Sequence, residues 1–210
     1  MQVSKVIIKL VLLFFGGLSI WSCSADSGPL APQAYANWIQ NPTNGLHLVK
    51  EMKGLEFSMQ YKPLDYIVVM EEKQTALKQA FVESRKSEIG NDTYYFNFRI
   101  TSKESNSPLD WGTSDEMAYS ERLAYCTFGM QQDLKMIEGT DTLACALFQF
   151  VRNYDIAPYL DFVIGFERKN TQETTVDKTI IFEDRTFGIG TIKFLLENNS
   201  LKNIPLLKTI

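Results

Sequence analysis

The chain has 210 residues, of which 45% are hydrophobic and 12% aromatic, and this is more apolar material than a disordered protein carries. A chain of this length usually forms one domain and buries about 70% of the surface that it exposes when unfolded. The formal net charge of −4 argues against binding to nucleic acid and against a basic membrane-binding face.

The first 22 residues have the composition of a secretory leader. Lys5 and Lys9 provide a positive start, and the apolar stretch 10–21 follows them. As a helix, that stretch would cover only about 18 Å at 1.5 Å per residue, whereas the apolar core of a bilayer is about 30 Å thick. We therefore predict that residues 1–22 form a signal peptide that is removed. The remaining chain has 19 cationic and 25 acidic side chains, a net charge of −6.

The leader ends in the stretch Ile20-Trp21-Ser22-Cys23. This stretch resembles the lipobox of bacterial lipoproteins, in which an aliphatic residue and two small residues precede a cysteine. Ile20 and Ser22 match that pattern, and Trp21 is bulkier than the residue usual there. The resemblance covers residues 1–23 and implies that Cys23 becomes the N-terminus and carries a diacylglycerol and a further acyl chain such as palmitate. Two or three long acyl chains hold a protein to a bilayer far more firmly than one.

The resemblance implies a location in the cell envelope, with the membrane bound through the lipid on Cys23. Ser24, which follows the cysteine, permits transport to the outer membrane in many bacteria, so the outer membrane is expected, on its periplasmic or its surface face. An ordinary signal peptide that is cut at another residue and an uncleaved N-terminal anchor are the alternatives.

The rest of the chain predicts a tether followed by one globular unit. Residues 23–33 comprise the lipid-bearing cysteine and a polar segment with Pro and Gly and without an apolar period, which is typical of a flexible tether. Residues 34–210 predict a single α+β domain, with a mainly antiparallel β-sheet and two or three helices. The first helix is expected from Tyr35 to Ile39, since Pro42 would end it.

Two strands follow, because residues 55–61 and 94–101 alternate apolar and polar side chains, so that one face can enter a core. Residues 71–88 between them contain strong helix formers, and Gly90 is placed to end a helix. Residues 66–70 either extend that helix or form a strand, since Ile67, Val68 and Val69 are β-branched.

Residues 114–137 allow two interpretations. Thr113 and Glu116 have the spacing of a capping box, and apolar residues then recur at steps of three and four, which favours a helix. Residues 122–130 also alternate as a strand would. In both interpretations Cys126 points inward.

The second half predicts a meander of antiparallel strands, because its connections are short. Residues 143–151 are apolar on both faces, as in a central strand. Residues 160–166 form a one-sided strand. Residues 178–183 and 187–196 follow, joined by the short turn 184–186.

Cys126 and Cys145 remain if Cys23 carries lipid. They either form a disulfide, which would close a loop of about 20 residues and stabilise the fold by about 3 kcal/mol, or are two small buried apolar residues.

Catalytic motifs are scarce in this sequence. His47 is the one histidine, which excludes an HExxH zinc helix and any site with several histidines. We therefore predict no catalytic residue, no metal site and no cofactor, and expect His47 at the surface or in a loop. Gly188 and Gly190 lack the rest of a phosphate-loop motif and predict a bulge or a close backbone approach within a strand.

Paired carboxylates are the enzymatic alternative, since a glycosidase needs two acids about 5–10 Å apart. Five acids lie near expected loops or element ends: Glu104, Asp110, Asp115, Glu116 and Asp141. Because the chain has 25 acids, a solvated surface position is the simpler expectation for each of them.

Three aromatic residues lie in or beside expected loops: Trp38, Trp111 and Tyr154. Such rings stack on sugars, anchor protein partners or close the ends of a core. Trp111, within the polar stretch 107–114, is the candidate contact for a partner or a glycan.

Taken together, these patterns favour a non-enzymatic accessory or binding subunit of an envelope assembly. Its expected partners are the membrane and envelope proteins, and not nucleic acid. The alternatives are an envelope hydrolase, in which Asp110, Glu116 or Asp141 would converge in a cleft, and a carrier of a small ligand or lipid, with a large apolar cavity inside the sheet.

Overall fold

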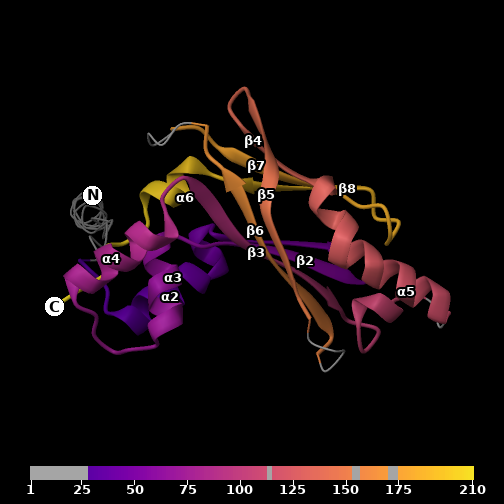
Figure 1. Cartoon of the computed structure of the whole chain (residues 1–210), viewed down its shortest axis with the longest axis horizontal. Coiled ribbons are helices and arrows are strands. Elements are labelled where there is room, and N and C mark those ends of the chain that lie inside the picture. Colours follow the sequence, from indigo (N-terminus) through magenta and orange to yellow (C-terminus); the bar gives the residue numbers. More distant parts are fainter. Residues whose placement is uncertain (1–27, 113–114, 153–156, 170–174) are drawn as a thin grey trace, which may run out of the picture.

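The computed structural model of the chain describes residues 28–112, 115–152, 157–169 and 175–210, and its arrangement is shown in Figure 1. The strands are β1 (His47–Met52), β2 (Leu55–Tyr61), β3 (Thr93–Ser102), β4 (Leu134–Glu138), β5 (Asp141–Val151), β6 (Tyr159–Glu167), β7 (Lys178–Glu183) and β8 (Thr191–Leu196). The α-helices are α2 (Pro32–Gln40), α3 (Leu64–Glu72), α4 (Gln79–Ile89), α5 (Glu116–Ala124) and α6 (Asn198–Lys202). The expected α+β class is therefore broadly confirmed. The sheet dominates the fold, and the described residues form more helices than the two or three that were expected.

The eight strands form one sheet in the order β1-β2-β3-β6-β5-β4-β7-β8, and all neighbours pair antiparallel. This confirms the expected antiparallel sheet. The sheet curls until its two edge strands, β1 and β8, lie next to each other. Helices α2, α3 and α4 gather at one end of the sheet, and α5 lies at the other end (Figure 1).

Aromatic side chains fill the interior of the curled sheet. β3 buries every second side chain, as its alternation predicted. The ring centroid of Phe98 on β3 lies 5.3 Å from that of Phe182 on β7 and 6.2 Å from that of Phe194 on β8. Because strands from both halves of the sheet share these contacts, the sheet closes around one core. The phenylalanines that are fully buried there are Phe57, Phe96, Phe98, Phe162, Phe166, Phe182 and Phe194.

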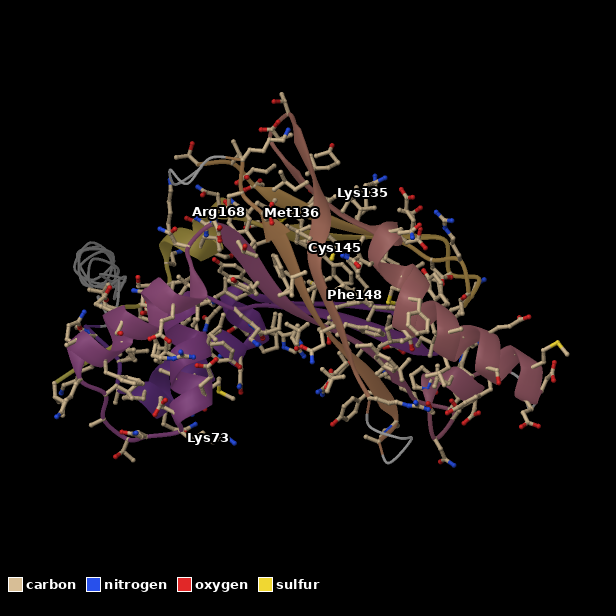
Figure 2. The ribbon with its side chains drawn as sticks, in the orientation of Figure 1. Lys73, Lys135, Met136, Cys145, Phe148 and Arg168 are labelled. Atoms are coloured by element: carbon tan, nitrogen blue, oxygen red, sulfur yellow. The ribbon has the colours of Figure 1, made fainter. Side chains whose placement is uncertain are left out.

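Strand β5 bends and joins the two halves of the sheet. Residues 141–144 pair with β4, and residues 145–151 pair with β6. The register of the β5–β6 pairing shifts between Cys145, which Figure 2 labels, and Leu147. Residues 143–151 belong to a central strand, as expected, but the burial of both faces that this position implied is wrong. Only Leu143 and Cys145 are buried, and Leu147 is 40% exposed, since the outer face of the bent strand is open to solvent.

The helix expected over residues 71–88 is two helices. Residues 66–70, which were left open, belong to α3, and Lys73 ends this helix in the left-handed conformation with φ of 52° (Figure 2). α4 begins six residues later. Between the two helices Leu77 is buried in the core, so the chain leaves the helical conformation where this side chain packs.

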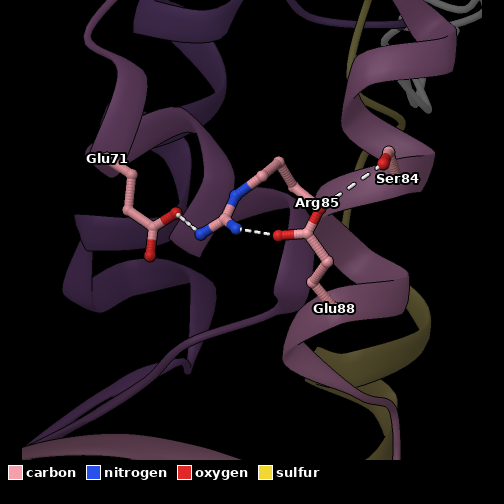
Figure 3. A network of polar contacts seen from close by, with 4 residues as sticks. All are labelled: Glu71, Ser84, Arg85 and Glu88. Atoms are coloured by element: carbon pink, nitrogen blue, oxygen red, sulfur yellow. Dashed lines mark hydrogen bonds and ion pairs between the residues drawn. The ribbon is translucent and has the colours of Figure 1, made fainter.

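Arg85 on α4 holds the two helices together, as Figure 3 shows. Its Nη2 lies 2.9 Å from a carboxylate oxygen of Glu71 on α3, and its Nη1 donates to Glu88 on its own helix. Ser84 contacts the same Glu88 carboxylate. Of these two ion pairs, only the one with Glu71 joins α4 to α3, and its side chains are 32% and 43% exposed, so its contribution to stability is small.

Of the two interpretations for residues 114–137, the helix is confirmed for most of the segment and the strand over residues 122–130 is wrong. The chain is helical through α5, a turn of π-helix (Tyr125–Gly129) and a 3-10 turn (Met130–Asp133), and then becomes strand β4. The Asp115 carboxylate caps α5 by accepting a backbone N–H at 3.1 Å. Thr113, the other half of the expected capping box, lies outside the described residues. Cys126 points inward, as predicted.

The strand expected over residues 187–196 begins only at Thr191, because a loop precedes it. The Asp184 carboxylate accepts the backbone N–H groups of Thr186, Phe187 and Ile189 at 2.7 to 2.9 Å. Gly188 and Gly190 have φ of 66° and 83°, values that glycine adopts readily. The expected bulge within a strand is therefore a separate loop, whose amides point to a carboxylate of the chain itself.

A buried ion pair joins β4 to β7. Lys178 Nζ lies 3.3 Å from a Glu138 carboxylate oxygen, and the two side chains are 1% and 8% exposed. The Tyr94 hydroxyl donates to the same carboxylate at 2.7 Å. The charge of each partner is therefore compensated inside the core.

Regular structure begins inside residues 23–33, the segment that was expected to be a flexible tether. Leu30 forms a parallel bridge with Leu207, and α2 begins at Pro32. Cys23 and the expected signal peptide lie outside the described residues. Within the described part of the chain, no helix is both long and apolar enough to cross a membrane.

Candidate functional site

A polar groove lies on the face of β2 and β3 that is turned away from the core. We name it the β2–β3 groove. It has a volume of about 690 Å³, and residues from α2 and α3 form one of its sides. The lining residues are Gln40, His47, Glu56, Ser58, Gln60, Lys62, Tyr66, Met70, Asn97, Arg99, Thr101 and Tyr159.

The groove is polar because of the strand alternation. The side chains of β3 that are not buried in the core include Asn97, Arg99 and Thr101, and Ser58 of β2 lies opposite Arg99 in the register. Successive side chains of a strand point to opposite faces, so the pattern that builds the core also builds the groove floor.

Arg99 is a fixed cation on the groove floor. Its Nε and Nη2 donate to the two carboxylate oxygens of Asp161 on β6, at 2.6 and 2.8 Å. Its guanidinium also lies 3.8 Å from the centre of the Tyr159 ring. The hydrogen bonds that Arg99 donates to Asp161 raise the pKa of Arg99 above its usual value. A bidentate, stacked guanidinium loses little further freedom when it binds a ligand.

Lys62 provides a second cation, and its environment is less favourable to charge. It follows β2 directly, and its backbone N–H donates to Tyr95 at 2.9 Å. Burial lowers the pKa of Lys62, while the charge of Glu71 acts in the opposite direction. Among the described residues, the Lys62 ammonium has no hydrogen bond or ion pair within contact distance. An anionic ligand group would therefore gain a partly desolvated partner here.

The side of the groove is held in place by amide side chains. Gln40 on α2 donates to the Tyr66 hydroxyl on α3 at 2.8 Å. Gln60 Nε2 on β2 donates to three backbone carbonyls, at 2.9 to 3.2 Å, of which one belongs to Ile39 on α2. These bonds position the helices against the sheet, so the groove is pre-formed.

His47 lies in this groove, at the first position of β1. The sequence predicted a surface or loop position, and the structure shows a half-buried strand residue. The single histidine therefore belongs to the lining of the site, which its neighbours in the sequence did not indicate.

Trp111, the predicted partner or glycan contact, does not line the groove. Its side chain is half-buried and packs against the core, and its carbonyl accepts a hydrogen bond from Arg122 at 2.6 Å. Trp38 also packs against the core, and Tyr154 lies outside the described residues. A contact through Trp111 stays a prediction.

The acids proposed for a hydrolase do not line the groove either. Asp110 belongs to a 3-10 turn and Glu116 begins α5, whereas Asp141 is paired with Lys169 near the β4–β5 turn. Figure 1 places this turn and α5 at different ends of the molecule. Glu56 is the acid that lines the groove, and Asp161, which lies beside it, accepts two hydrogen bonds from Arg99.

Cys126 and Cys145 are both buried free thiols in the structure, which corresponds to the second of the two alternatives for this pair. Burial raises the pKa of Cys126 to about 12 and that of Cys145 to about 11. The thiolate form is therefore scarce at neutral pH.

In the described part of the chain, no cluster of three or more His, Cys, Asp or Glu side chains is suited to hold a metal ion. Comparisons with protein-family models, curated proteins and solved structures found no match to this chain. The groove is therefore interpreted from its own geometry.

Proposed function

We propose that this chain is a lipoprotein of the cell envelope, anchored through Cys23, and that its globular part is a non-enzymatic binding subunit of an envelope assembly. The contact surface is the β2–β3 groove. Its partner is an envelope protein that presents an acidic segment rich in hydrogen-bonding groups. The observation that carries this proposal is the pre-formed polar groove, whose lining includes the cations Lys62 and Arg99, the latter paired with Asp161, and one acid, Glu56.

Support for a binding role comes from Arg99, the groove cation that is held in fixed contacts, and from Lys62, whose ammonium is open to a ligand. Arg99 is oriented by Asp161 and Tyr159, so it offers direction and charge to a ligand carboxylate. The exposed Met70 and the half-buried ring of Tyr159 add apolar contact area next to these charges. This mixture of a few oriented polar groups with aromatic surface is typical of recognition sites.

The interior of the sheet gives no comparable support to the carrier alternative. That hypothesis needs a large apolar cavity between the strands, and phenylalanine rings occupy this space. Rings whose centroids lie 5 to 6 Å apart are in packing contact, as the 5.8 Å between Phe98 and Phe162 illustrates.

Site-specific photocrosslinking in native membranes tests the proposal. A photoreactive residue in place of Thr101 lies in the groove, whereas one in place of Lys193, an exposed residue of β8, does not. We expect a reproducible protein adduct from position 101 and a much weaker one from position 193. Equal labelling from both positions, or only glycan adducts at position 101, would contradict the proposal.

The anchor is tested separately by labelled fatty acid. The unaltered chain should incorporate the label, and Cys23→Ala should abolish incorporation and release the protein from membranes or block its processing. Incorporation that persists in Cys23→Ala would place the anchor elsewhere.

A further inference from the structure

The last described segment, residues 204–210, forms an exposed apolar edge at the helical end of the molecule (Figure 1). It is extended, and its side chains alternate: Leu207 packs against the core, whereas Leu206, Lys208 and Ile210 point outward. Leu206 is 73% and Ile210 75% exposed. Large apolar side chains that project together from a surface mark an interaction site.

Backbone hydrogen bonds hold this segment between the start of the described chain and α4. The Leu30 N–H donates to the Leu206 carbonyl at 2.8 Å, and the Lys208 N–H donates to the Leu30 carbonyl at 2.7 Å. The Ile210 N–H donates to the Leu77 carbonyl at 2.9 Å. Phe81 on α4, which is 36% exposed, lines the same hollow as Ile210. We call Phe81, Leu206, Lys208 and Ile210 the terminal patch.

The terminal patch lies next to the point at which the chain leaves for Cys23. Gly28 follows Cys23 by five residues, and five residues span at most about 18 Å when fully extended. Figure 1 shows α5 at the opposite end of the molecule from helices α2, α3 and α4. A lipid on Cys23 would therefore keep this end of the molecule, and not the end at α5, beside the bilayer.

The composition of the patch suits such a surface. Apolar side chains next to a lysine fit the boundary between acyl chains and anionic headgroups. The hollow that Phe81 and Ile210 line is also lined by one cation, Lys78, and one acid, Glu72.

We infer that the terminal patch rests on the bilayer and orients the domain against the membrane. This inference depends on the proposed anchor at Cys23. It gives the groove a fixed position as well, since Gln40, Tyr66 and Met70 come from the helices at the membrane-facing end.

Spin labels on the full lipidated chain test this orientation. Leu206→Cys carries a nitroxide in the patch. Phe128→Cys carries a matched label at the α5 end, where Phe128 is 80% exposed. The parent protein, which has neither added cysteine, measures background labelling, and this should be low because Cys126 and Cys145 are buried. The proteins are reconstituted into vesicles of phosphatidylethanolamine and phosphatidylglycerol.

We expect the label at position 206 to be about fivefold less accessible than the label at 128 to a water-soluble nickel chelate, and more accessible to oxygen. Equal chelate accessibility in vesicle-bound protein would overturn the orientation and leave the anchor standing. An unacylated protein that does not bind the vesicles would overturn both.

A second variant separates orientation from attachment. The double variant Leu206→Ser, Ile210→Ser removes the apolar side chains of the patch, while the acyl chains still hold the protein to the vesicle. A label at Lys208→Cys should then be severalfold more accessible to the chelate than the same label in the parent protein. Unchanged accessibility would also overturn the inference.

Discussion

Lys62 is the residue at which binding and stability are expected to oppose each other. Burial lowers the pKa of Lys62 in the folded chain, because it penalises the charged ammonium there and not in the unfolded chain. Lys62→Met should therefore raise the free energy of unfolding at pH 7 while it weakens binding in the groove. Functional sites commonly combine such a stability cost with activity.

The pH dependence of this effect follows from the direction of the pKa shift. Between the lowered pKa and the ordinary value of 10.5, the unfolded chain binds more protons at Lys62, so the stability of the parent protein rises with pH. The stability difference between Lys62→Met and the parent should shrink over this window. Urea denaturation at pH 7 and pH 10.5 measures it, and an unchanged difference would contradict the burial of the charge.

Cys126 and Cys145 should behave as inert buried thiols. Their raised pKa values, about 12 and about 11, predict slow reaction with a thiol reagent in the folded protein and rapid reaction of both after unfolding. Intact mass should not change on reduction. A gain of about 2 Da would show that a disulfide joins the pair.

At the scale of elements, two ion pairs between β4 and β7 provide a matched comparison. Glu138 and Lys178 form the buried pair, and Lys135 and Glu183 form a pair that is 39% and 45% exposed. Glu138→Gln should lower the free energy of unfolding by about 3 to 5 kcal/mol, because it leaves the Lys178 charge in the core without its carboxylate.

Glu183→Gln is the control, since solvent screens its pair with Lys135, and it should leave stability nearly unchanged. Chemical denaturation of both variants gives the comparison. Similar losses in the two variants would contradict the assignment of the buried pair as the stabilising contact.

Strands were easier to predict than helices in this chain. Residues 55–61 and 94–101 alternate because each strand has one face in the core, and this period is written in the local sequence. The break between α3 and α4 depends on the burial of Leu77 by distant parts of the chain, so helix propensity over residues 71–88 did not predict it. The loop at Asp184 has a different, local cause, since the Asp184 carboxylate accepts three backbone N–H groups within five residues, which the apolar pattern of residues 187–196 did not indicate.

The groove is a property of the whole molecule and could not be located from one segment. Its polar floor was visible as the solvent-facing side of the predicted strands. Its pairing of Arg99 with Asp161, however, joins residues 62 positions apart, and its side comes from α2 and α3. Sequence spacing gave no reason to bring Lys62 and His47 to the same surface.

The central claim is that the chain binds its partner through the groove. The yield of the crosslinked adduct in variants that lack a groove charge tests this claim most directly. Lys62→Gln and Arg99→Gln each remove one groove cation, and Lys135→Gln removes one cation from an exposed ion pair elsewhere. With the photoreactive residue at position 101, we predict that adduct yield falls at least about tenfold in the two groove variants, as the loss of a charge-assisted bond implies, and stays at the parent level in Lys135→Gln. Equal yields in all three variants would contradict the account.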